Sequence, residues 1–181
     1  MNLPKFPEGF SADFLNKALS ANFLPSGISI QEVSIEPLAE GTGMMADISK
    51  LTFKYNTESL HLSFSVIAKY ASENPTNREV AMNMNLYERE TRFADELDPQ
   101  TDARCPAFYY CALDGDNFLI LMEDLSDYEV GDQEIGANLE QTELAIDELA
   151  KLHTAFWDKT ATLKWVPGIA NSYHADNMRN W

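Results

Sequence analysis

The order of its strand-like and helix-like segments constrains the fold of this chain most strongly. Residues 28–38, 47–55 and 60–70 alternate apolar and polar side chains, which is the period-two pattern of strands with one buried face. A turn-like Asn-Thr-Glu-Ser sequence at 56–59 separates the second segment from the third. The pattern predicts three consecutive antiparallel strands.

A helical pattern follows these strands. Residues 77–98 carry apolar side chains at helical spacing, so we predict one long helix there. Two further strands are predicted at 105–112 and 117–123, joined by Leu-Asp-Gly-Asp-Asn, whose Asp-Gly step is a strong hairpin signal. Additional helices are expected at 11–22, where a serine provides the N-cap, and at 138–159.

The resulting chain order is helix, three strands, helix, two strands, helix. We therefore expect an α+β fold with a five-stranded antiparallel sheet and one helix inserted before the fourth strand. The 181 residues are enough for one domain, or for one domain and part of another.

Composition limits the partners and the compartment. The formal net charge is −16, which argues against binding to nucleic acids or anionic membranes. It suits a cationic ligand, although a solvated acidic surface is the simpler explanation. No apolar run approaches the roughly 20 residues of a membrane span, and the N-terminus lacks the pattern of a signal peptide. Cys105 and Cys111 lack metal-type spacing and are interpreted as reduced thiols, so we expect a cytoplasmic protein.

Lys69 ends an otherwise apolar strand. In an extended segment 60–70, side chains alternate between the two faces, so Lys69 lies on the face of His61, Ser63 and Ser65, which is suited to line a cleft. A lysine that merely extends into solvent at a strand end is the simpler alternative. The opposite, apolar face consists of Leu60, Leu62, Phe64, Val66, Ala68 and Tyr70.

A carboxylate in the following helix favours the interpretation that Lys69 lines a cleft. The predicted apolar stripe of that helix consists of Leu86, Glu90, Phe93 and Leu97. An unpaired carboxylate on an apolar face is costly, so Glu90 requires a cation, and Lys69 on a preceding strand is the obvious candidate. Glu88 belongs to the polar side of the helix and is the weaker choice.

A glycine pair lies between the first two predicted strands. Gly41 and Gly43 let the backbone turn tightly and approach a phosphate group closely. A Gly-x-Gly sequence between strands is more often simply a turn, so this signal is weak by itself.

The whole layout resembles the N-terminal lobe of the protein-kinase-like superfamily. Four stretches resemble the aminoglycoside-phosphotransferase-like group, and most closely its ecdysteroid-kinase-like branch. They are Ser-Val-Ile-Ala-Lys-Tyr around Lys69, the sequence NLYERETRFADEL around Glu90, Leu-Met-Glu-Asp-Leu after the fifth strand, and GDQEIGANLEQTELAIDELAKLHTAFW. The resemblance extends from about residue 33 to residue 159.

This resemblance implies an ATP site. Lys69 would position the α- and β-phosphates, Glu90 would hold Lys69, and Gly41, Thr42 and Gly43 would cover the phosphates. The fifth strand would lead into the hinge between two lobes. Adenine would then lie beside Met122 and bond to the Glu123 carbonyl and the Leu125 amide, while Asp132 would reach ribose or substrate, although an exposed acidic loop explains Asp132 equally well. Residues 1–125 would form the N-terminal lobe with its hinge, and residues 126–181 the start of a helical C-terminal lobe.

The same resemblance implies a catalytic loop of the His-Gly-Asp type and Mg²⁺ ligands, and neither is found in this sequence. His174, Asp176 and Asn180 imitate such a loop, but they follow the hinge too soon and with the wrong spacing. His153 shares a stripe with Leu149 and is expected to be a buried core residue. We therefore expect an N-terminal, catalytically incomplete part of an ATP-dependent kinase that phosphorylates a small-molecule hydroxyl.

Two alternatives stay open at this point. The first alternative to the kinase interpretation is a non-catalytic nucleotide-binding or scaffold domain. The second is an α+β ligand-binding domain with no nucleotide role. In the second case Glu90 would pair with another cation, and ATP would not stabilise the protein against heat.

Overall fold

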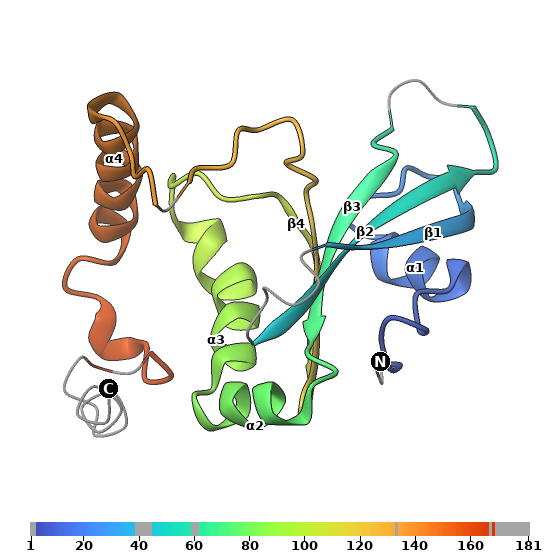
Figure 1. Cartoon of the computed structure of the whole chain (residues 1–181), viewed down its shortest axis with the longest axis horizontal. Helices are drawn as coiled ribbons and strands as arrows, with labels where there is room; N and C mark the ends of the chain where they lie inside the picture. The colour runs from blue at the N-terminus through green and yellow to red at the C-terminus, as the bar shows by residue number, and fades with distance from the viewer. Residues whose placement is uncertain (1–2, 39–44, 59–61, 133, 167, 169–181) are drawn as a thin grey trace. The chain divides into compact units, whose positions relative to one another are not determined.

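The computed structural model describes residues 3–38, 45–58, 62–132, 134–166 and 168 (Figure 1). The chain divides into two compact units. The first comprises Met1–Asp95 and Cys105–Glu129, and the second comprises Glu96–Arg104 and Val130–Trp181.

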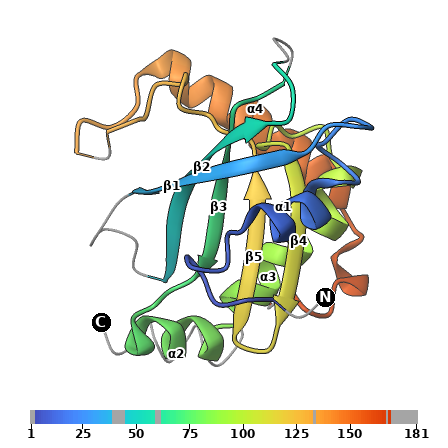
Figure 2. The same cartoon turned by 90° about the vertical axis from the view of Figure 1, so that its right-hand side faces the viewer.

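A five-stranded sheet forms the centre of the first unit. Its strands are β1 (Ile30–Leu38), β2 (Ala46–Tyr55), β3 (Ser65–Ala71), β4 (Phe108–Asp114) and β5 (Asn117–Met122). They lie in the order β1-β2-β3-β5-β4, and every neighbouring pair is antiparallel (Figure 2). The predicted antiparallel α+β architecture is confirmed.

The hairpin between β4 and β5 shows why its sequence was informative. Asp114 pairs with Asn117 across a two-residue turn, and Gly115 has a φ of +63°. A glycine adopts this left-handed conformation without the steric cost that a Cβ atom imposes.

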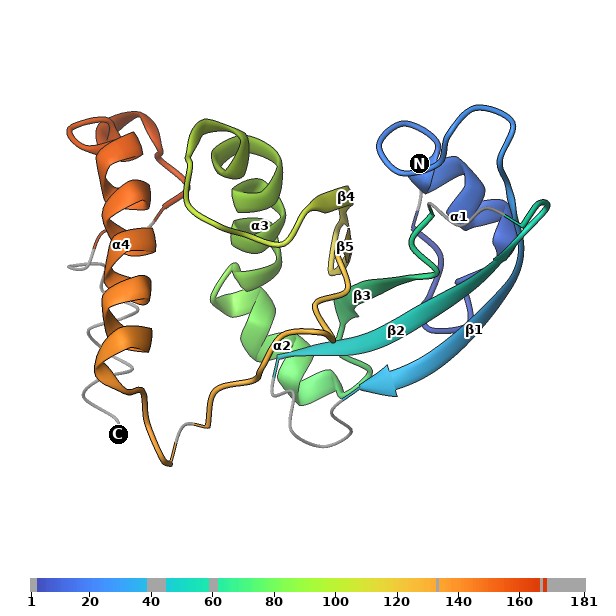
Figure 3. The same ribbon diagram turned by 90° about the horizontal axis from the view of Figure 1, so that it is seen from above.

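The sheet has a separate hydrophobic core on each face. Seen from above, it separates α1 (Ala12–Leu19) from α2 (Pro75–Asn83) and α3 (Leu86–Arg92) (Figure 3). On the α1 side, Leu15 and Leu19 pack against the sheet, and the Ser11 hydroxyl accepts a hydrogen bond from the Phe14 amide at 3.2 Å. On the other side the core consists of Ala46, Ala71, Ala81, Tyr87, Phe118 and Ile120.

The predicted helix at 77–98 is wrong as a single element. The chain leaves α2 at Met84, and Asn85 adopts a left-handed conformation with φ of +53° before α3 begins. Asparagine tolerates this conformation better than most residues, so the break has a local cause. A π-helical turn at Phe93–Leu97 and a short 3₁₀ helix at Asp98–Gln100 then continue the segment.

The buried side of α3 differs from the predicted stripe. Between residues 86 and 97 the buried positions are Tyr87, Thr91, Ala94 and Leu97, whereas Leu86, Glu90 and Phe93 are partly exposed. The prediction is wrong at three of its four positions, because helical spacing gives the period of a stripe but not which side of the helix meets the core.

The strand predictions are close but not identical to the structure. β3 begins at Ser65 rather than at residue 60, and Phe64 is 57% exposed instead of sharing the buried face. Val66, Ala68 and Tyr70 are buried together, as the alternation predicted.

Among the described residues of the second unit, the long helix α4 (Leu139–Phe156) is followed by a short 3₁₀ helix at Thr160–Thr162. A capping box begins α4, since Asn138 and Gln141 each accept the other's backbone amide at 2.9 Å. His153 is exposed among the described residues, so its predicted burial is wrong. Helical spacing shows which residues share a face, but it does not show what packs against that face.

Candidate functional site

Lys69 lies on the sheet face that packs against α3. In the antiparallel register it pairs with Ile48 of β2 and with Ile120 of β5, and the side chain of Ile120 belongs to the core on the α3 side. The faces of β3 are therefore divided as the alternation predicted. Lys69 faces the helices, while its neighbours Ala68 and Tyr70 belong to the core beneath α1.

The structure brings Lys69 and Glu90 together. The Lys69 Nζ donates a hydrogen bond to the Glu90 Oε1 at 2.5 Å, and the two side chains are 26% and 42% exposed. Glu88 instead pairs with Arg92 one turn along the helix, at 3.3 Å. An ion pair with this much solvent contact contributes little to stability.

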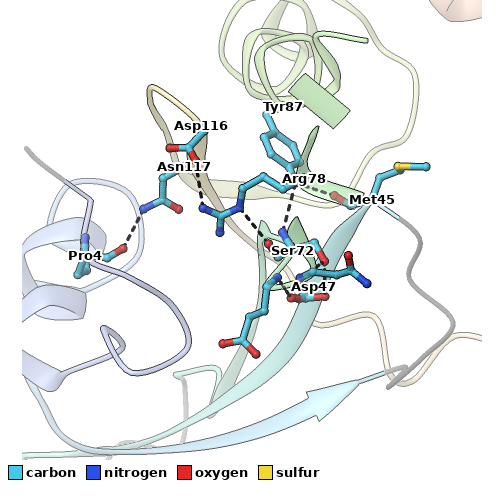
Figure 4. Close-up of polar contacts among 10 residues, drawn as sticks. Pro4, Met45, Asp47, Ser72, Arg78, Tyr87, Asp116 and Asn117 are labelled. Carbon is cyan, nitrogen blue, oxygen red and sulfur yellow. Dashed lines mark hydrogen bonds and ion pairs between the residues drawn. The ribbon is translucent and has the colours of Figure 1, made fainter. Parts of the chain in front are cut away.

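Tyr87, one turn before Glu90, connects α3 to the sheet. Its hydroxyl donates to the Met45 carbonyl at 2.7 Å and accepts the Ser72 amide at 3.2 Å (Figure 4). Its ring stacks on Phe118 with a centroid distance of 4.2 Å. Burial raises the pKa of Tyr87, so its hydroxyl stays protonated and can donate.

The turn that leaves β3 is tied down by charged side chains. Asp47 accepts the Glu73 amide at 2.7 Å and the Ser72 hydroxyl at 3.3 Å, while the Arg78 Nε donates to the Ser72 carbonyl at 3.0 Å (Figure 4). Arg78 also contacts Asp116 of the β4–β5 hairpin at 3.3 Å. We call Met45, Asp47, Ser72, Arg78 and Tyr87 the turn network; it anchors the strand of Lys69 and the helix of Glu90 to one another.

The glycine turn lies outside the described residues. Gly41, Thr42 and Gly43 belong to the segment between β1 and β2, and Met45 is the first described residue after it. Their predicted phosphate contacts therefore stay predictions.

The segment after β5, residues 123–128, corresponds to the predicted hinge, and we call it the hinge segment. The Glu123 amide donates to the Ala107 carbonyl at 2.9 Å, and the Leu125 carbonyl accepts the Tyr128 amide at 2.9 Å. These bonds use different groups from the Glu123 carbonyl and the Leu125 amide that are predicted to bond adenine. Met122 pairs with Ile67 of β3, so it lies two residues along the sheet from the row that contains Lys69.

Sequence reasoning missed a second ion pair, between Lys50 of β2 and Asp124 of the hinge segment, at 2.7 Å. The Asp124 Oδ2 also accepts the Ser65 hydroxyl at 2.5 Å, and the Oδ1 accepts the Ser126 amide at 2.9 Å and the Ser126 hydroxyl. We call Lys50, Ser65, Asp124 and Ser126 the hinge cluster. Two features of the sequence could have indicated this pair. Asp124 lies between the predicted adenine-binding residues Glu123 and Leu125, and Lys50 lies inside a predicted strand.

The hinge cluster has a distinct electrostatic character. Burial alone would raise the pKa of Asp124, but the hydrogen bonds from Lys50, Ser126 and Ser65 outweigh it and hold that pKa well below its usual range. The hydrogen bond to Asp124 correspondingly raises the pKa of Lys50. Both groups are therefore ionised at neutral pH.

Asp132 belongs to the second unit. Its Oδ1 accepts the backbone amides of Glu134 and Ile135 at 2.8 and 3.0 Å, so the carboxylate closes a local turn. Its predicted contact with ribose or substrate stays a prediction.

The described residues contain neither a metal-type cluster nor a membrane-spanning helix. Among these residues, no group of three or more His, Cys, Asp or Glu side chains is arranged to hold a metal ion. Residues 174–180, which imitate a catalytic loop, lie outside the described ranges. Cys105 and Cys111 carry thiols rather than a disulfide bond. The helices within the same ranges include none with both the length and the apolar character to cross a membrane.

The fold and the ion pair at Lys69 define a class of protein. An antiparallel five-stranded sheet with helices between its third and fourth strands, followed by further helices, is the arrangement of a kinase-like N-terminal lobe and the start of the next lobe. Sequence comparison agrees, since the profile of the ecdysteroid kinase-like family matches residues 40–157, more than half of the chain. The chain belongs to the ecdysteroid kinase-like family, a family of kinase-like small-molecule phosphotransferases. No curated protein and no solved structure shows significant similarity to it.

Proposed function

We propose that the protein transfers the γ-phosphate of ATP to a hydroxyl group of a small molecule, and that this chain supplies the ATP-binding part. The observation that carries this proposal is the 2.5 Å contact between Lys69 and Glu90 in a member of a kinase-like family. The identity of each of these groups matters, because a lysine bonds phosphate oxygens and a carboxylate keeps it directed at them.

The chemistry of the described residues fits a nucleoside triphosphate. Lys69 binds the α- and β-phosphates and neutralises part of their charge, while Glu90 restricts the position of its ammonium group. The backbone at residues 41–43 covers the phosphates, and the hinge segment bonds the base through the Glu123 carbonyl and the Leu125 amide beside Met122. These residues accelerate transfer by positioning and charge neutralisation rather than by covalent chemistry.

Magnesium, when bound, neutralises charge on the phosphate groups. The described residues contain no group of three or more His, Cys, Asp or Glu side chains that could hold a metal ion, so none of them is assigned to Mg²⁺. The metal ligands and the base that accepts the hydroxyl proton would come from outside those residues. The two thiols support a cytoplasmic location for the enzyme.

ATP binding measured by isothermal titration calorimetry tests the proposal. We expect the wild-type chain to bind ATP and the Lys69→Ala variant to bind it at least about tenfold more weakly, because a charge-assisted contact is lost. Lys54→Ala is the matched control, since Lys54 lies on β2 in an exposed pair with Glu32, and it should bind like the wild type. A wild type that does not bind ATP, or a Lys69→Ala variant with unchanged affinity, would overturn the proposal.

A further inference from the structure

We infer that Lys50 and Asp124 are positioning residues that hold the hinge segment in the orientation required to bind a nucleotide base. The inference rests on the proposed function and deepens it, because it assigns the base-binding half of the ATP site to a particular set of side chains. Four observations about the hinge cluster carry it.

The first observation is how completely the Asp124 carboxylate is held. One oxygen contacts the Lys50 Nζ at 2.7 Å and the Ser65 hydroxyl at 2.5 Å, and the other contacts the amide and the hydroxyl of Ser126. The carboxylate thus bonds to two strands, β2 and β3, and to its own segment. A group with this many partners has one orientation, and the adjoining backbone is fixed with it.

The second observation is that the Asp124 carboxylate is shielded from solvent. The side chain of Asp124 is 9% exposed and that of Lys50 is 26% exposed. The pair between Lys54 and Glu32, which also involves a lysine of β2, is 69% exposed on both sides. An exposed pair contributes little to a preferred geometry, whereas a shielded pair with further hydrogen bonds restricts it.

The third observation is where Asp124 lies in the chain. It stands between Glu123 and Leu125, whose carbonyl and amide are the proposed base-binding groups. The opposite groups of these two residues, the Glu123 amide and the Leu125 carbonyl, are bonded to Ala107 and Tyr128. The Glu123 carbonyl and the Leu125 amide belong to the two planar peptide units that flank the Asp124 Cα atom, so holding the Asp124 side chain, with a bond on either side of it, restricts the backbone rotations that would turn them.

The fourth observation is the row that Lys50 forms with its cross-strand neighbours. Lys50 pairs with Ile67, and Ile67 pairs with Met122, on the sheet face that carries Lys69. Two residues along a strand span about 7 Å, so this row is one step from the phosphate-binding lysine and borders the hinge segment. A base bonded to the hinge segment lies against the row. With its ammonium held by Asp124, Lys50 offers its methylene stem to the base.

The test compares a ligand that contains the base with one that lacks it. ATP carries adenine, ribose and a triphosphate, whereas inorganic tripolyphosphate carries the phosphates alone. For the Asp124→Asn variant, which keeps the side-chain shape but removes the charge, we expect the Kd for ATP to rise roughly tenfold. The Kd for tripolyphosphate should stay at the wild-type value. Glu32→Gln, in the exposed pair, is the matched control and should change neither.

The outcomes separate the inference from the proposed function. Unchanged ATP affinity in Asp124→Asn, with a wild type that binds ATP, overturns the inference alone. Equal losses for both ligands also overturn it, because they indicate general damage rather than loss of base positioning. A wild type that binds no ATP overturns both. If Asp124→Asn does not fold, Ser65→Ala provides the milder variant, for which we expect a two- to threefold increase in the Kd for ATP alone.

Discussion

The two ion pairs on the α3-facing side of the sheet differ in how much of their bonding capacity is used inside the protein. Lys69 and Glu90 form a short contact but stay 26% and 42% exposed. Asp124 is 9% exposed, and hydroxyl and amide groups of two serines bond to it in addition to Lys50. In the proposed function, the first pair binds the phosphates of ATP and the second holds the backbone of the hinge segment. The same two types of charge would then serve as a binding group at one position and as a positioning group at the other.

Turnover of the complete enzyme provides the largest expected contrast between the pairs. Replacing Lys69 by alanine should lower kcat about a hundredfold or more, because the group proposed to position the α- and β-phosphates and neutralise their charge is lost. The free energy of unfolding should change by less than about 0.5 kcal/mol, since the pair is solvent-exposed. Steady-state kinetics and urea denaturation measure the two quantities. Unchanged turnover would remove Lys69 from the site.

At the hinge cluster, in contrast to Lys69, we expect a large loss of stability. Asp124→Ala should lower the free energy of unfolding by about 2 kcal/mol, because Lys50 and two serines lose a charged partner in a shielded position. Urea denaturation of this variant beside Glu32→Ala, in the exposed pair, measures the difference. Equal losses in the two variants would show that the burial of Asp124 has no energetic consequence.

The turn network should give a smaller effect. Tyr87→Phe keeps the ring stacked on Phe118 but leaves the Met45 carbonyl and the Ser72 amide without the hydroxyl, so unfolding should become easier by about 1 kcal/mol. The same denaturation experiment measures it, with Tyr87→Leu expected to cost more because the stacking is lost as well. A phenylalanine variant as stable as the wild type would mean that water replaces the hydroxyl.

The smallest expected effect is the pH dependence of the Lys50–Asp124 pair. A carboxyl group whose folded-state pKa is depressed stabilises the fold above its unfolded pKa, near 4, and this stabilisation is lost only as the pH falls through the lower folded pKa. The stability difference between the wild type and Asp124→Asn should therefore be constant from pH 8 to pH 5 and shrink below about pH 4. Denaturation curves at several pH values measure it. A difference that already declines between pH 7 and pH 5 would contradict the depressed pKa.

The sequence was sufficient for features that depend on local pattern. Alternation assigned Lys69 and Val66 to opposite faces, the Asp-Gly step located the hairpin, and the cost of an unpaired carboxylate on a helical stripe led to Glu90, although the buried stripe itself lies elsewhere on the helix. It was insufficient where a result depends on register or on a local distortion. The hinge cluster requires that Lys50, Ile67 and Met122 be aligned across three strands, and no single segment contains that information. The exposed His153 and the buried Tyr87 show the same limit for helices. Helical spacing shows which residues share a side of a helix, but not which side packs against the rest of the protein.

The left-handed residue between α2 and α3 changes the direction of the chain. With φ at +53°, the backbone of Asn85 lets α3 begin in a direction of its own, so the helix that bears Glu90 is not a straight extension of α2. The direction of the helix that carries the carboxylate opposite Lys69 is therefore set by the two backbone torsions of one residue. A β-branched residue at position 85, which disfavours a positive φ, is expected to redirect that helix.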